Sequence, residues 1–399
     1  MPNFQGVWSL SEQYQAIGSQ NWPMAPGAPT GVSAAAGDEQ ATVSFTAPSF
    51  TGVPPGITQY LVTSDPGAIT ETGSASPITV TGLSNGTAYT FSVQATNGVQ
   101  FGPAGVSGSV SPVDASNRGL FMGAEQANDT IQYIQITSTG NSIDFGDLTV
   151  GRGNMGATAS STRAVAMCGT GPSSSTQNVF DYVTIASTGN ATDFGDATAA
   201  KNNGIGSCSS STRGVIAGGS AAGRTDVIEY ITIASTGNGT DFGDLGTARD
   251  NINGGMSNGT RGICAYGGYG GGGPSVISSL EYITIASTGN SSDFGNATKG
   301  AFIWGCASNS TRGLAGDDTD IDYITIASTG NASDFGDLAT SRGDCTAVAN
   351  ATRCVFTGSG TDDTDYVTIA TTGNSSDFGD LVSEGQQSAG VSNAHGGLS

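Results

Sequence analysis

From about residue 117 to the end of the chain, large apolar residues return at fixed positions in six successive stretches. In each stretch a segment such as EYITIASTGN, which starts at Glu229, alternates Tyr and Ile with polar or small residues and ends in a Ser-Thr-Gly-Asn turn. A period of two places one set of side chains on a packed face, and Gly and Asn tolerate the positive φ that hairpin turns need. The pattern predicts a β-hairpin in every repeat.

A tyrosine and a phenylalanine mark the two strands of each predicted hairpin. The two are always 12 positions apart, and the phenylalanine lies in an Asp-Phe-Gly element. The tyrosines are Tyr133, Tyr182, Tyr230, Tyr282, Tyr323 and Tyr366, and the phenylalanines are Phe145, Phe194, Phe242, Phe294, Phe335 and Phe378. The constant spacing indicates one invariant turn with both rings as structural residues of the repeat.

An arginine at the start of a further apolar segment is the third landmark of the repeat. It is found at Arg118, Arg163, Arg213, Arg261, Arg312 and Arg353. The 17 to 19 positions that follow each phenylalanine leave room for one more short strand. Four strands in each repeat of about 41 to 52 residues are typical of a β-propeller blade. In a ring the arginines would form one layer, each pairing with the Asp of an Asp-Phe-Gly turn, and this structural role is favoured over six anion sites.

The two ends of this region complement each other. The first repeat opens at Arg118 without a preceding strand, and SNAHGG (Ser392–Gly397) aligns with SNSTRG (Ser308–Gly313), which places His395 where an arginine is expected. We therefore expect residues 114–399 to form a six-bladed β-propeller in which residues 386–392 complete the first blade.

The repeat resembles the kelch propeller family. The shared features are a strand that ends in Gly218-Gly219, a tyrosine strand, a large aromatic residue and a following arginine such as Arg249 or Arg342. Phe replaces the family's tryptophan and four repeats lack the Gly-Gly doublet, so the resemblance implies the fold and no kelch partner.

Residues 27–113 show a second β pattern. Alternating stretches at 41–46, 59–64, 78–81 and 88–96 are separated by Pro, Gly, Asn and Asp clusters, which predicts a β-sandwich. TGLSNGTAYTF resembles the fibronectin type III family, with Leu83 and Tyr89 at its core positions and Phe45 in place of its tryptophan. The chain has no Arg-Gly-Asp tripeptide, so integrin binding is not implied, and a spacer role is expected.

Residues 1–26 form a short aromatic segment with Trp8, Tyr14 and Trp22. A helix is expected from Ser9 to Ile17, with Ser9 as its N-cap and Glu12 at the capping-box position. A segment that exposes this much apolar surface indicates attachment to a larger assembly, which we favour over a frayed tag on the next domain.

Composition limits the classes of partner. The chain holds 63 glycines in 399 residues, and its formal charge is −21, which disfavours binding to nucleic acid or to anionic membranes. We expect no membrane insertion, because no apolar run reaches about 18 residues, and no secretory signal, because a basic n-region is lacking. The fold class expected is all-β.

The six cysteines form no Cys-x-x-Cys pair, and the chain has one histidine. Zinc ligation is therefore disfavoured, and buried free thiols are expected in preference to disulfides.

Two groups of residues are candidates for ligand binding. The spacing from Arg to Tyr varies from 11 to 21 positions, and the longest of these loops, residues 265–279, carries Tyr266 and Tyr269 in a glycine-rich setting. Tyrosines on such loops suit protein recognition or stacking on sugar rings, although tolerated surface insertions are the preferred interpretation. A carboxylate cluster could bind Ca²⁺ weakly, but solvated turn aspartates are the preferred interpretation. The cluster comprises Asp317, Asp318, Asp320, Asp362 and Asp363. No other cofactor is expected.

Catalysis has little support in the sequence. His395 lies at a repeat position near the C-terminus, and a Ser-His-Asp or Cys-His site would need it placed elsewhere. Two carboxylates suffice for glycoside hydrolysis, but no pair stands out from the repeated aspartates. We expect a protein that is not an enzyme.

The whole arrangement resembles bacteriophage virion proteins. GVWSLSEQYQAIGSQNWP is similar to a segment near the start of many tail-fibre and appendage proteins, and repeats of the ITIASTGNATDFGDL kind occur in such proteins. The resemblance implies a virion location, contact with other virion proteins through residues 1–26, and a homo-oligomer in the particle. The first hypothesis is an appendage that displays the propeller to a host-surface receptor or glycan. The second is a purely architectural head-decoration, tail or baseplate piece, and a polysaccharide-degrading enzyme is a distant third.

Overall fold

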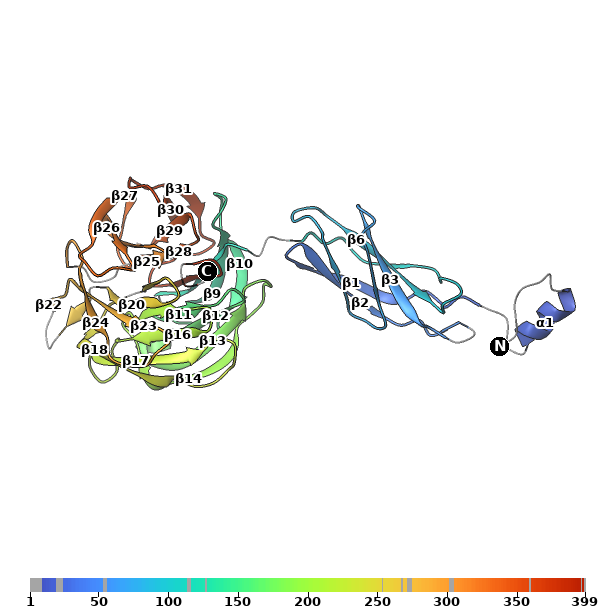
Figure 1. The fold of residues 1–399 in the computed structure, drawn as a ribbon, viewed down its shortest axis with the longest axis horizontal. Coiled ribbons are helices and arrows are strands. Elements are labelled where there is room, and N and C mark those ends of the chain that lie inside the picture. Colours follow the sequence, from blue (N-terminus) through green and yellow to red (C-terminus); the bar gives the residue numbers. More distant parts are fainter. Residues whose placement is uncertain are drawn as a thin grey trace. The chain divides into compact units, whose positions relative to one another are not determined.

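The computed structural model divides into two compact units, Met1–Ala115 and Ser116–Ser399, which we describe separately (Figure 1). The structure describes residues 9–18, 24–52, 56–112, 116–125, 128–252, 254–266, 268–270, 275–300, 305–358, 360–395 and 397.

The described part of unit 1 contains one short helix and two antiparallel sheets. Helix α1 is Leu10–Gly18, and its N-terminus has the expected capping box, in which the Ser9 amide donates to the Glu12 carboxylate over 2.7 Å. One sheet has the strand order β1-β2-β5 and the other the order β4-β3-β6-β7. The strands are β1 (Thr30–Gly37), β2 (Gln40–Thr46), β3 (Gln59–Asp65), β4 (Thr70–Gly73), β5 (Ile78–Thr81), β6 (Thr90–Thr96) and β7 (Gly105–Val106).

Strict alternation explains the core of this sandwich. Along β2, Ala41, Val43 and Phe45 are buried while their neighbours face outward, and the ring of Phe45 packs 4.7 Å from that of Tyr60 on β3. Tyr89 is buried as well, and its hydroxyl accepts a hydrogen bond from the Ser84 amide over 3.1 Å. The four stretches expected from the sequence are β2, β3, β5 and β6. Strands β1, β4 and β7 were not expected, because they are short or built of small residues with weak alternation.

Unit 2 contains six antiparallel sheets in its described part. Sheet 1 has the order β10-β9-β8-β32, sheet 2 the order β11-β12-β13-β14, and sheet 3 the order β15-β16-β17-β18-β21-β22. Sheet 4 has the order β19-β20-β23-β24, sheet 5 the order β25-β26-β27, and sheet 6 the order β28-β29-β30-β31.

The strand bounds of sheets 1 to 3 are β8 (Arg118–Ala124), β9 (Asn128–Gln135), β10 (Ile143–Asp147), β32 (Ala389–Ser392), β11 (Gly156–Ala159), β12 (Arg163–Thr170), β13 (Thr176–Thr184), β14 (Thr192–Lys201), β15 (Gly206–Ser209), β16 (Arg213–Ala217), β17 (Thr225–Thr232), β18 (Thr240–Asp250), β21 (Tyr269–Gly270) and β22 (Ser275–Val276). A 3-10 turn, Pro172–Ser174, joins β12 to β13. The strand bounds of sheets 4 to 6 are β19 (Met256–Ser257), β20 (Arg261–Tyr266), β23 (Ser279–Thr284), β24 (Ser292–Asn296), β25 (Gly305–Ser308), β26 (Arg312–Thr325), β27 (Ser333–Arg342), β28 (Thr346–Ala349), β29 (Arg353–Thr357), β30 (Asp363–Thr368) and β31 (Ser376–Asp380).

Sheet 5 differs from the others by its long strand β26. This strand spans 14 residues and covers the positions that two strands occupy in the other sheets. Asp318 lies at its midpoint in a left-handed conformation, with φ of 54°.

The first strands of the six sheets, here called the inner strands, contact one another in a fixed order. The contacts run from β32 to β11, β15, β19, β25 and β28, and β28 contacts β32 in turn. Second strands such as β8 and β12 are almost entirely buried, because neighbouring sheets cover both of their faces. Small residues allow this close approach: a Cβ on Gly119 of sheet 1 would lie 2.6 Å from Val348 of sheet 6.

The C-terminal strand belongs to the first sheet of the unit. Strand β32 pairs antiparallel with β8, with Ala389 opposite Met122 and Ser392 opposite Gly119. The residues expected to complete this sheet, 386–392, thus include the observed strand, which begins at Ala389.

The glycine of each Asp-Phe-Gly element has a definite role. Gly146 lies at a bulge of β10 with φ of 146°, and a Cβ there would lie 2.5 Å from the carbonyl of Gly189, in the Ser-Thr-Gly-Asn turn of sheet 2. The Gly189 amide donates to the Phe145 carbonyl over 2.7 Å. The same contact joins sheet 6 to sheet 1, where the Gly140 amide donates to the Phe378 carbonyl over 2.8 Å.

Candidate functional site

Each sheet of unit 2 contains the same cluster of an arginine, a tyrosine and a phenylalanine, here called the Arg–Tyr–Phe cluster. In sheet 3 the guanidinium of Arg213 lies 4.3 Å from the ring centroid of Tyr230, which meets Phe242 edge-on at 6.0 Å. Across the six sheets the two distances stay between 4.2 and 4.6 Å and between 5.9 and 6.1 Å. The guanidinium is attracted by the negative face of the tyrosine ring, and the edge-on pair places a positive ring edge on a negative face.

Every arginine of these clusters also reaches the following sheet. Arg213 Nη1 donates to the carbonyl of Ile285 over 2.8 Å. The complete set of such pairs is Arg118–Ile185, Arg163–Ile233, Arg213–Ile285, Arg261–Ile326, Arg312–Ile369 and Arg353–Ile136. The expected pairing with the Asp of an Asp-Phe-Gly turn is wrong. Those aspartates lie exposed on the strand that follows the tyrosine strand, whereas the arginine starts the second strand beside its tyrosine.

A second set of charged residues links consecutive sheets through buried ion pairs. The cation follows the phenylalanine of one sheet by seven positions, and the acid directly precedes the tyrosine of the next. The pairs are Arg152–Asp181, Lys201–Glu229, Arg249–Glu281 and Arg342–Asp365. Sequence reasoning noted Arg249 and Arg342 only as a family resemblance, although the paired spacing could have revealed their partners.

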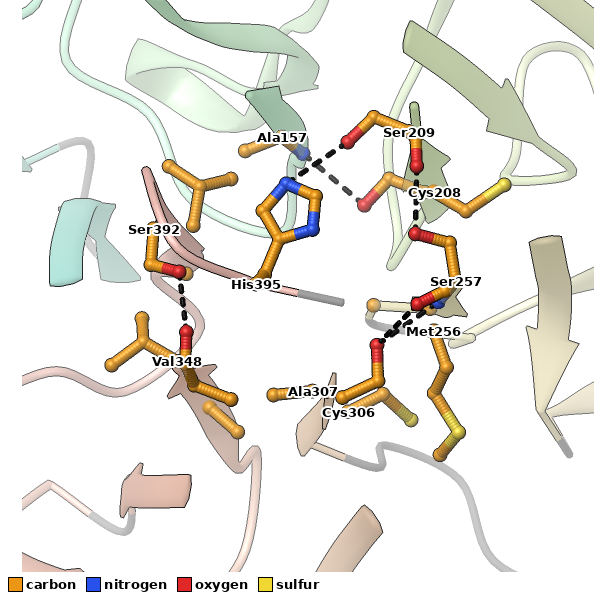
Figure 2. A pocket seen from close by; sticks show the side chains of 18 of the residues that line it. Ala157, Cys208, Ser209, Met256, Ser257, Cys306, Ala307, Val348, Ser392 and His395 are labelled. Atoms are coloured by element: carbon orange, nitrogen blue, oxygen red, sulfur yellow. Dashed lines mark hydrogen bonds between the residues drawn. The ribbon is translucent and has the colours of Figure 1, made fainter. Parts of the chain in front are cut away.

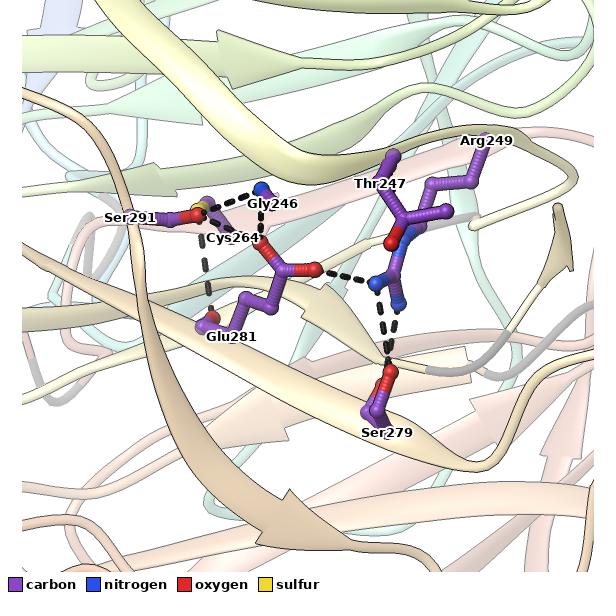
Figure 3. Close-up of polar contacts among 7 residues, drawn as sticks. All are labelled: Gly246, Thr247, Arg249, Cys264, Ser279, Glu281 and Ser291. Carbon is purple, nitrogen blue, oxygen red and sulfur yellow. Dashed lines mark hydrogen bonds and ion pairs between the residues drawn. The ribbon is translucent and has the colours of Figure 1, made fainter. Parts of the chain in front are cut away.

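Figure 3 shows the pair between sheets 3 and 4. Glu281 accepts hydrogen bonds from the Arg249 guanidinium, the Ser291 hydroxyl and, over 2.7 Å, the Gly246 amide. Arg249 also donates over 3.0 Å to the carbonyl of Ser279. Burial lowers the pKa of Arg249, and the nearby Glu281 carboxylate opposes this shift. Most polar atoms of the pair are satisfied, as a buried charge requires.

The junction between sheet 6 and sheet 1 carries a neutral version of this contact. Gln132 occupies the acid position, and Gly385 follows Phe378 by the seven positions at which the cation is found elsewhere. The Gln132 side chain donates to the Ser383 carbonyl over 2.8 Å and accepts from the Val382 amide over 2.8 Å. Both charges are therefore replaced together where the first and last sheets meet.

A small axial cavity lies among the inner strands of all six sheets (Figure 2). Its volume is about 50 Å³, and small residues such as Ala157, Ser207 and Ala307 line it. Serine hydroxyls join neighbouring inner strands, as where Ser257 Oγ donates to the Ser209 carbonyl over 2.7 Å. Pockets for organic ligands usually have volumes of about 300–1,000 Å³. The axial cavity is too small to bind a sugar.

His395 lies at this cavity and does not replace an arginine. Asn393 takes the role of Asn309 instead, because its Oδ1 accepts from the Arg118 amide over 2.9 Å, as Asn309 accepts from that of Arg312 over 2.8 Å. The expected alignment therefore holds through Asn393 and fails at His395, since Arg118 itself fills the arginine position of sheet 1.

The contacts of His395 do not form a catalytic triad. Its Nε2 lies 3.3 Å from Ser209 Oγ, but its Nδ1 accepts from the Gly397 amide over 3.0 Å and therefore does not donate to a carboxylate. A nucleophilic serine would need the opposite arrangement at Nδ1.

The loop with Tyr266 and Tyr269 reaches the neighbouring sheet. Tyr266 ends β20 in sheet 4, whereas Tyr269 starts β21, which pairs with the end of β18 in sheet 3, opposite Asp250. The two backbone positions thus lie on different sheets. Their side chains, and residues 267 and 271–274 of the same loop, lie outside the described part of the structure.

The candidate calcium ligands fall into two groups. Asp317, Asp318 and Asp320 lie on β26, where the Lys299 ammonium pairs with Asp320. Burial raises the pKa of Asp317 to about 6, and Lys299 opposes the shift. Asp362 and Asp363 are exposed near the start of β30. Among the described residues, no three His, Cys, Asp or Glu side chains gather in a way that suits a metal ion.

The proposed attachment residues are only partly described. Tyr14 on α1 is 70% exposed, while Trp8 and Trp22 lie outside the described residues. No helix in the described ranges is long and apolar enough to cross a membrane.

All six cysteines are free and buried. Burial raises the pKa of every one of these thiols, to about 12 at Cys168, Cys264 and Cys345 and well above the usual value at Cys208, Cys306 and Cys354. Reactive cysteines need an accessible thiolate, so these residues act as small apolar side chains of the core.

Comparison with known proteins identifies one domain. Residues 27–109 match the fibronectin type III domain, which is the two-sheet sandwich of unit 1. A crystal structure of domains A168–A170 from titin is 21% identical over 23% of this chain, with a TM-score of 0.21, and the match covers 33% of the titin structure. No curated protein matches the chain. The chain is thus an all-β protein with a fibronectin type III domain, followed by six sheets to which these comparisons assign no family.

Proposed function

We propose that residues 116–399 form a six-bladed, kelch-like β-propeller that the C-terminal strand closes. Three features that recur from sheet to sheet support a closed ring. The inner strands contact one another in a cyclic order, the Arg353 guanidinium of sheet 6 donates to Thr137 and Ile136 of sheet 1, and Gly140 bonds to Phe378 across the same junction. The absence of charge at Gln132 and Gly385, the two positions that carry the ion pair in other sheets, fits a seam where the two ends of the ring meet.

We further propose that the chain is a structural, non-catalytic appendage of a bacteriophage virion, such as a tail fibre, that displays this propeller to a receptor or glycan on the host surface. The observation that carries the binding role is the contrast between constant and variable parts of the sheets. The Arg–Tyr–Phe clusters keep their distances within a few tenths of an ångström, while the connection between the second and third strands ranges from none in sheet 5, where β26 is continuous, to the 12 residues between β20 and β23 in sheet 4. Variable loops on a rigid scaffold are where binding residues concentrate.

The fibronectin type III domain suits the role of a spacer between attachment and binding. Its strands carry no cluster of catalytic groups, and α1 before it exposes Leu10 and Tyr14, one helical turn apart, on 71% and 70% of their surfaces. Such an apolar stripe on a short helix favours contact with another protein, because an isolated helix of nine residues is marginal in water.

The longest variable loop offers the sharpest test of receptor binding. Particles that carry Tyr266→Ala and Tyr269→Ala should adsorb to host cells at least about tenfold more slowly, since stacked aromatic anchors dominate such interfaces. Thr188→Ala is the matched control, because Thr188 is exposed in the Ser-Thr-Gly-Asn turn between β13 and β14. It should leave adsorption unchanged.

The alternative role is purely architectural. Wild-type adsorption by particles that lack residues 116–399, together with failure of the isolated full-length chain to bind a glycan array, would overturn receptor binding and favour an architectural piece. Release of reducing sugar from host envelope polysaccharide would instead indicate an enzyme.

A further inference from the structure

The last described residues of the chain continue beyond strand β32 and cross one mouth of the axial cavity. We call Asn393, Ala394, His395 and Gly397 the tail latch. Asn393 is bonded to Arg118 of sheet 1, and the Nε2 of His395 lies 3.3 Å from the Ala159 carbonyl of sheet 2 and 3.3 Å from Ser209 Oγ of sheet 3.

Gly397 extends the tail latch to a fourth sheet. A Cβ at this position would lie 2.2 Å from the Ser209 carbonyl and 2.5 Å from the hydroxyl of Ser257 in sheet 4. Only glycine fits against this backbone, so the tail is in close contact with sheets 3 and 4. Sheets 1 to 4 are thus joined by a segment that contributes no strand at this point.

The hydrogen bonds of His395 determine which of its two ring nitrogens carries the proton when the ring is neutral. Because the Gly397 amide donates to Nδ1, that nitrogen carries no proton, and the proton of the neutral ring lies on Nε2, where it can be donated to the Ala159 carbonyl. A second proton would have to enter at Nδ1. It would face the Gly397 N–H, remove that hydrogen bond and leave two donors opposed.

The hydrogen bond to the Ala159 carbonyl favours the charged ring of His395, but burial outweighs it. Among the described residues that line the cavity there is no Asp, Glu, Lys or Arg, and its titratable members besides His395 are Cys208 on β15 and Cys306 on β25. Both thiols stay neutral because burial raises their pKa. The backbone amide of Arg118 donates to Asn393, whereas its guanidinium donates to the Ile185 carbonyl.

We propose that the tail latch is released from the axial cavity when His395 takes up a proton. The neutral ring holds sheets 1 to 4 together at the mouth of the cavity, and the charged ring loses its bond to Gly397. Strand β32 keeps its own pairing with β8, so release opens the mouth without removing the strand.

The direction of the pH dependence follows from desolvation. Partial burial lowers the pKa of His395 from 6.5 to about 4. A group whose pKa is lower in the closed state stabilises that state above its ordinary pKa, and this stabilisation is lost as the pH falls through the lower value. The latch should therefore be closed at neutral pH, and its opening constant should be about 100-fold larger at pH 4 than at pH 7.

Two measurements on the full-length, tag-free chain test this directly. His395 is the single histidine, so its ring signals in an NMR titration are unambiguous and should report a pKa near 4. Hydrogen–deuterium exchange, corrected for the intrinsic effect of pH, should show loss of protection at pH 4 in the peptide that contains residues 393–397, while peptides from β12, β16 and β29 stay protected.

Two variants distinguish the effect of protonating His395 from the effect of changing its packing. His395→Asn keeps an acceptor for the Gly397 amide and does not titrate, so its tail should exchange at the same corrected rate at both pH values. His395→Lys places a fixed charge at the site, and its tail should already be unprotected at pH 7.

The proposal is overturned if His395 titrates near 6.5, if His395→Asn keeps the acid step, or if His395→Lys stays protected at pH 7. It is overturned equally if all peptides of unit 2 lose protection together at pH 4, because the acid step would then be global unfolding. None of these outcomes depends on whether the chain is a virion protein.

Discussion

At the scale of single residues, each sheet of unit 2 depends on a guanidinium that has two partners. Arg213 stacks on Tyr230 within its own sheet and donates to the Ile285 carbonyl in the next. The tyrosines, phenylalanines and arginines could all be predicted as structural residues from their spacing. The hydrogen-bond partner of the arginine could not be predicted. For Arg213 it is a backbone carbonyl about 70 residues further along the chain, and every residue has such a carbonyl whatever its side chain.

Replacing this guanidinium should weaken both sheets. Arg213→Met keeps an apolar stem over Tyr230 but loses the charge and the donor, so we expect a loss of about 1–3 kcal/mol. The midpoint of urea unfolding measures this loss. Arg213→Lys keeps the charge without the planar group and should fall between the wild type and Arg213→Met. An unchanged midpoint for Arg213→Met would show that the cluster contributes nothing to stability.

The buried ion pairs permit a test of mutual dependence. Arg249→Met leaves the Glu281 carboxylate buried without its cation, which should cost about 3–5 kcal/mol. The double variant Arg249→Met, Glu281→Gln should recover much of this loss, because a neutral Gln132 occupies the acid position between sheets 6 and 1 and bonds there to Ser383 and Val382. Urea unfolding of the two variants supplies the comparison. Equal losses would contradict the assigned pairing.

At the scale of the elements, neighbouring hairpins interlock through glycine. Sequence reasoning placed the Ser-Thr-Gly-Asn turn and the Asp-Phe-Gly strand correctly within one repeat. It did not predict that the turn of one sheet packs on the Asp-Phe-Gly bulge of the sheet before it, because a repeat read alone gives no information on how its copies stack. The long strand β26 was also not predicted, since the short spacing from Arg312 to Tyr323 was read as a loop.

Gly146 and Gly189 have similar φ values but different surroundings. Substituting each of them therefore distinguishes backbone strain from a steric clash with the next sheet. Gly146 and Gly189 have φ values of 146° and 153°, but a Cβ on Gly146 would lie 2.5 Å from Gly189, whereas a Cβ on Gly189 would meet nothing within 4 Å. Gly146→Ala should therefore lower the thermal midpoint more than Gly189→Ala, by an extra loss of about 1–3 kcal/mol for the overpacked contact. Equal effects of the two substitutions would mean that the sheets do not interlock here.

At the scale of the whole molecule, the net charge of −21 has a structural explanation. The strands that carry the Asp-Phe-Gly elements each expose the Asp of that element, at Asp144, Asp193, Asp241, Asp293, Asp334 and Asp377, and in five of the six sheets this strand lies at the edge. Charges on exposed edge strands prevent sheets of different molecules from pairing. The acidic composition was read from the sequence as a limit on partners, and the structure adds that part of it lies on exposed strands at the sheet edges.

The pairing of the C-terminal strand with the first sheet of unit 2 could be predicted because the two incomplete repeats complement each other in sequence. The position of the residues beyond Ser392 could not be predicted. His395 aligns with the arginine position of the repeat, but in the structure it lies at the axial cavity instead. The repeat pattern constrains the last strand only as far as its final pairing with β8, at Ser392. The residues that follow make no hydrogen bonds of the sheet and can pack against other sheets.

A disulfide across the first and last strands tests the central claim, a ring closed by its own C-terminal strand. Val391 lies opposite Leu120 in the pairing of β32 with β8, and both side chains face the same core cluster. Directly opposite residues of antiparallel strands have Cβ atoms about 4.5–5.5 Å apart, a short distance from disulfide geometry. The variant Leu120→Cys, Val391→Cys should therefore cross-link within one molecule on mild oxidation and raise the urea midpoint, as peptide mapping and unfolding will show. In the control Phe121→Cys, Val391→Cys, residue 121 faces a different cluster, so no cross-link is expected. Absence of the first cross-link, or equal yields from the two variants, would contradict closure by the C-terminal strand.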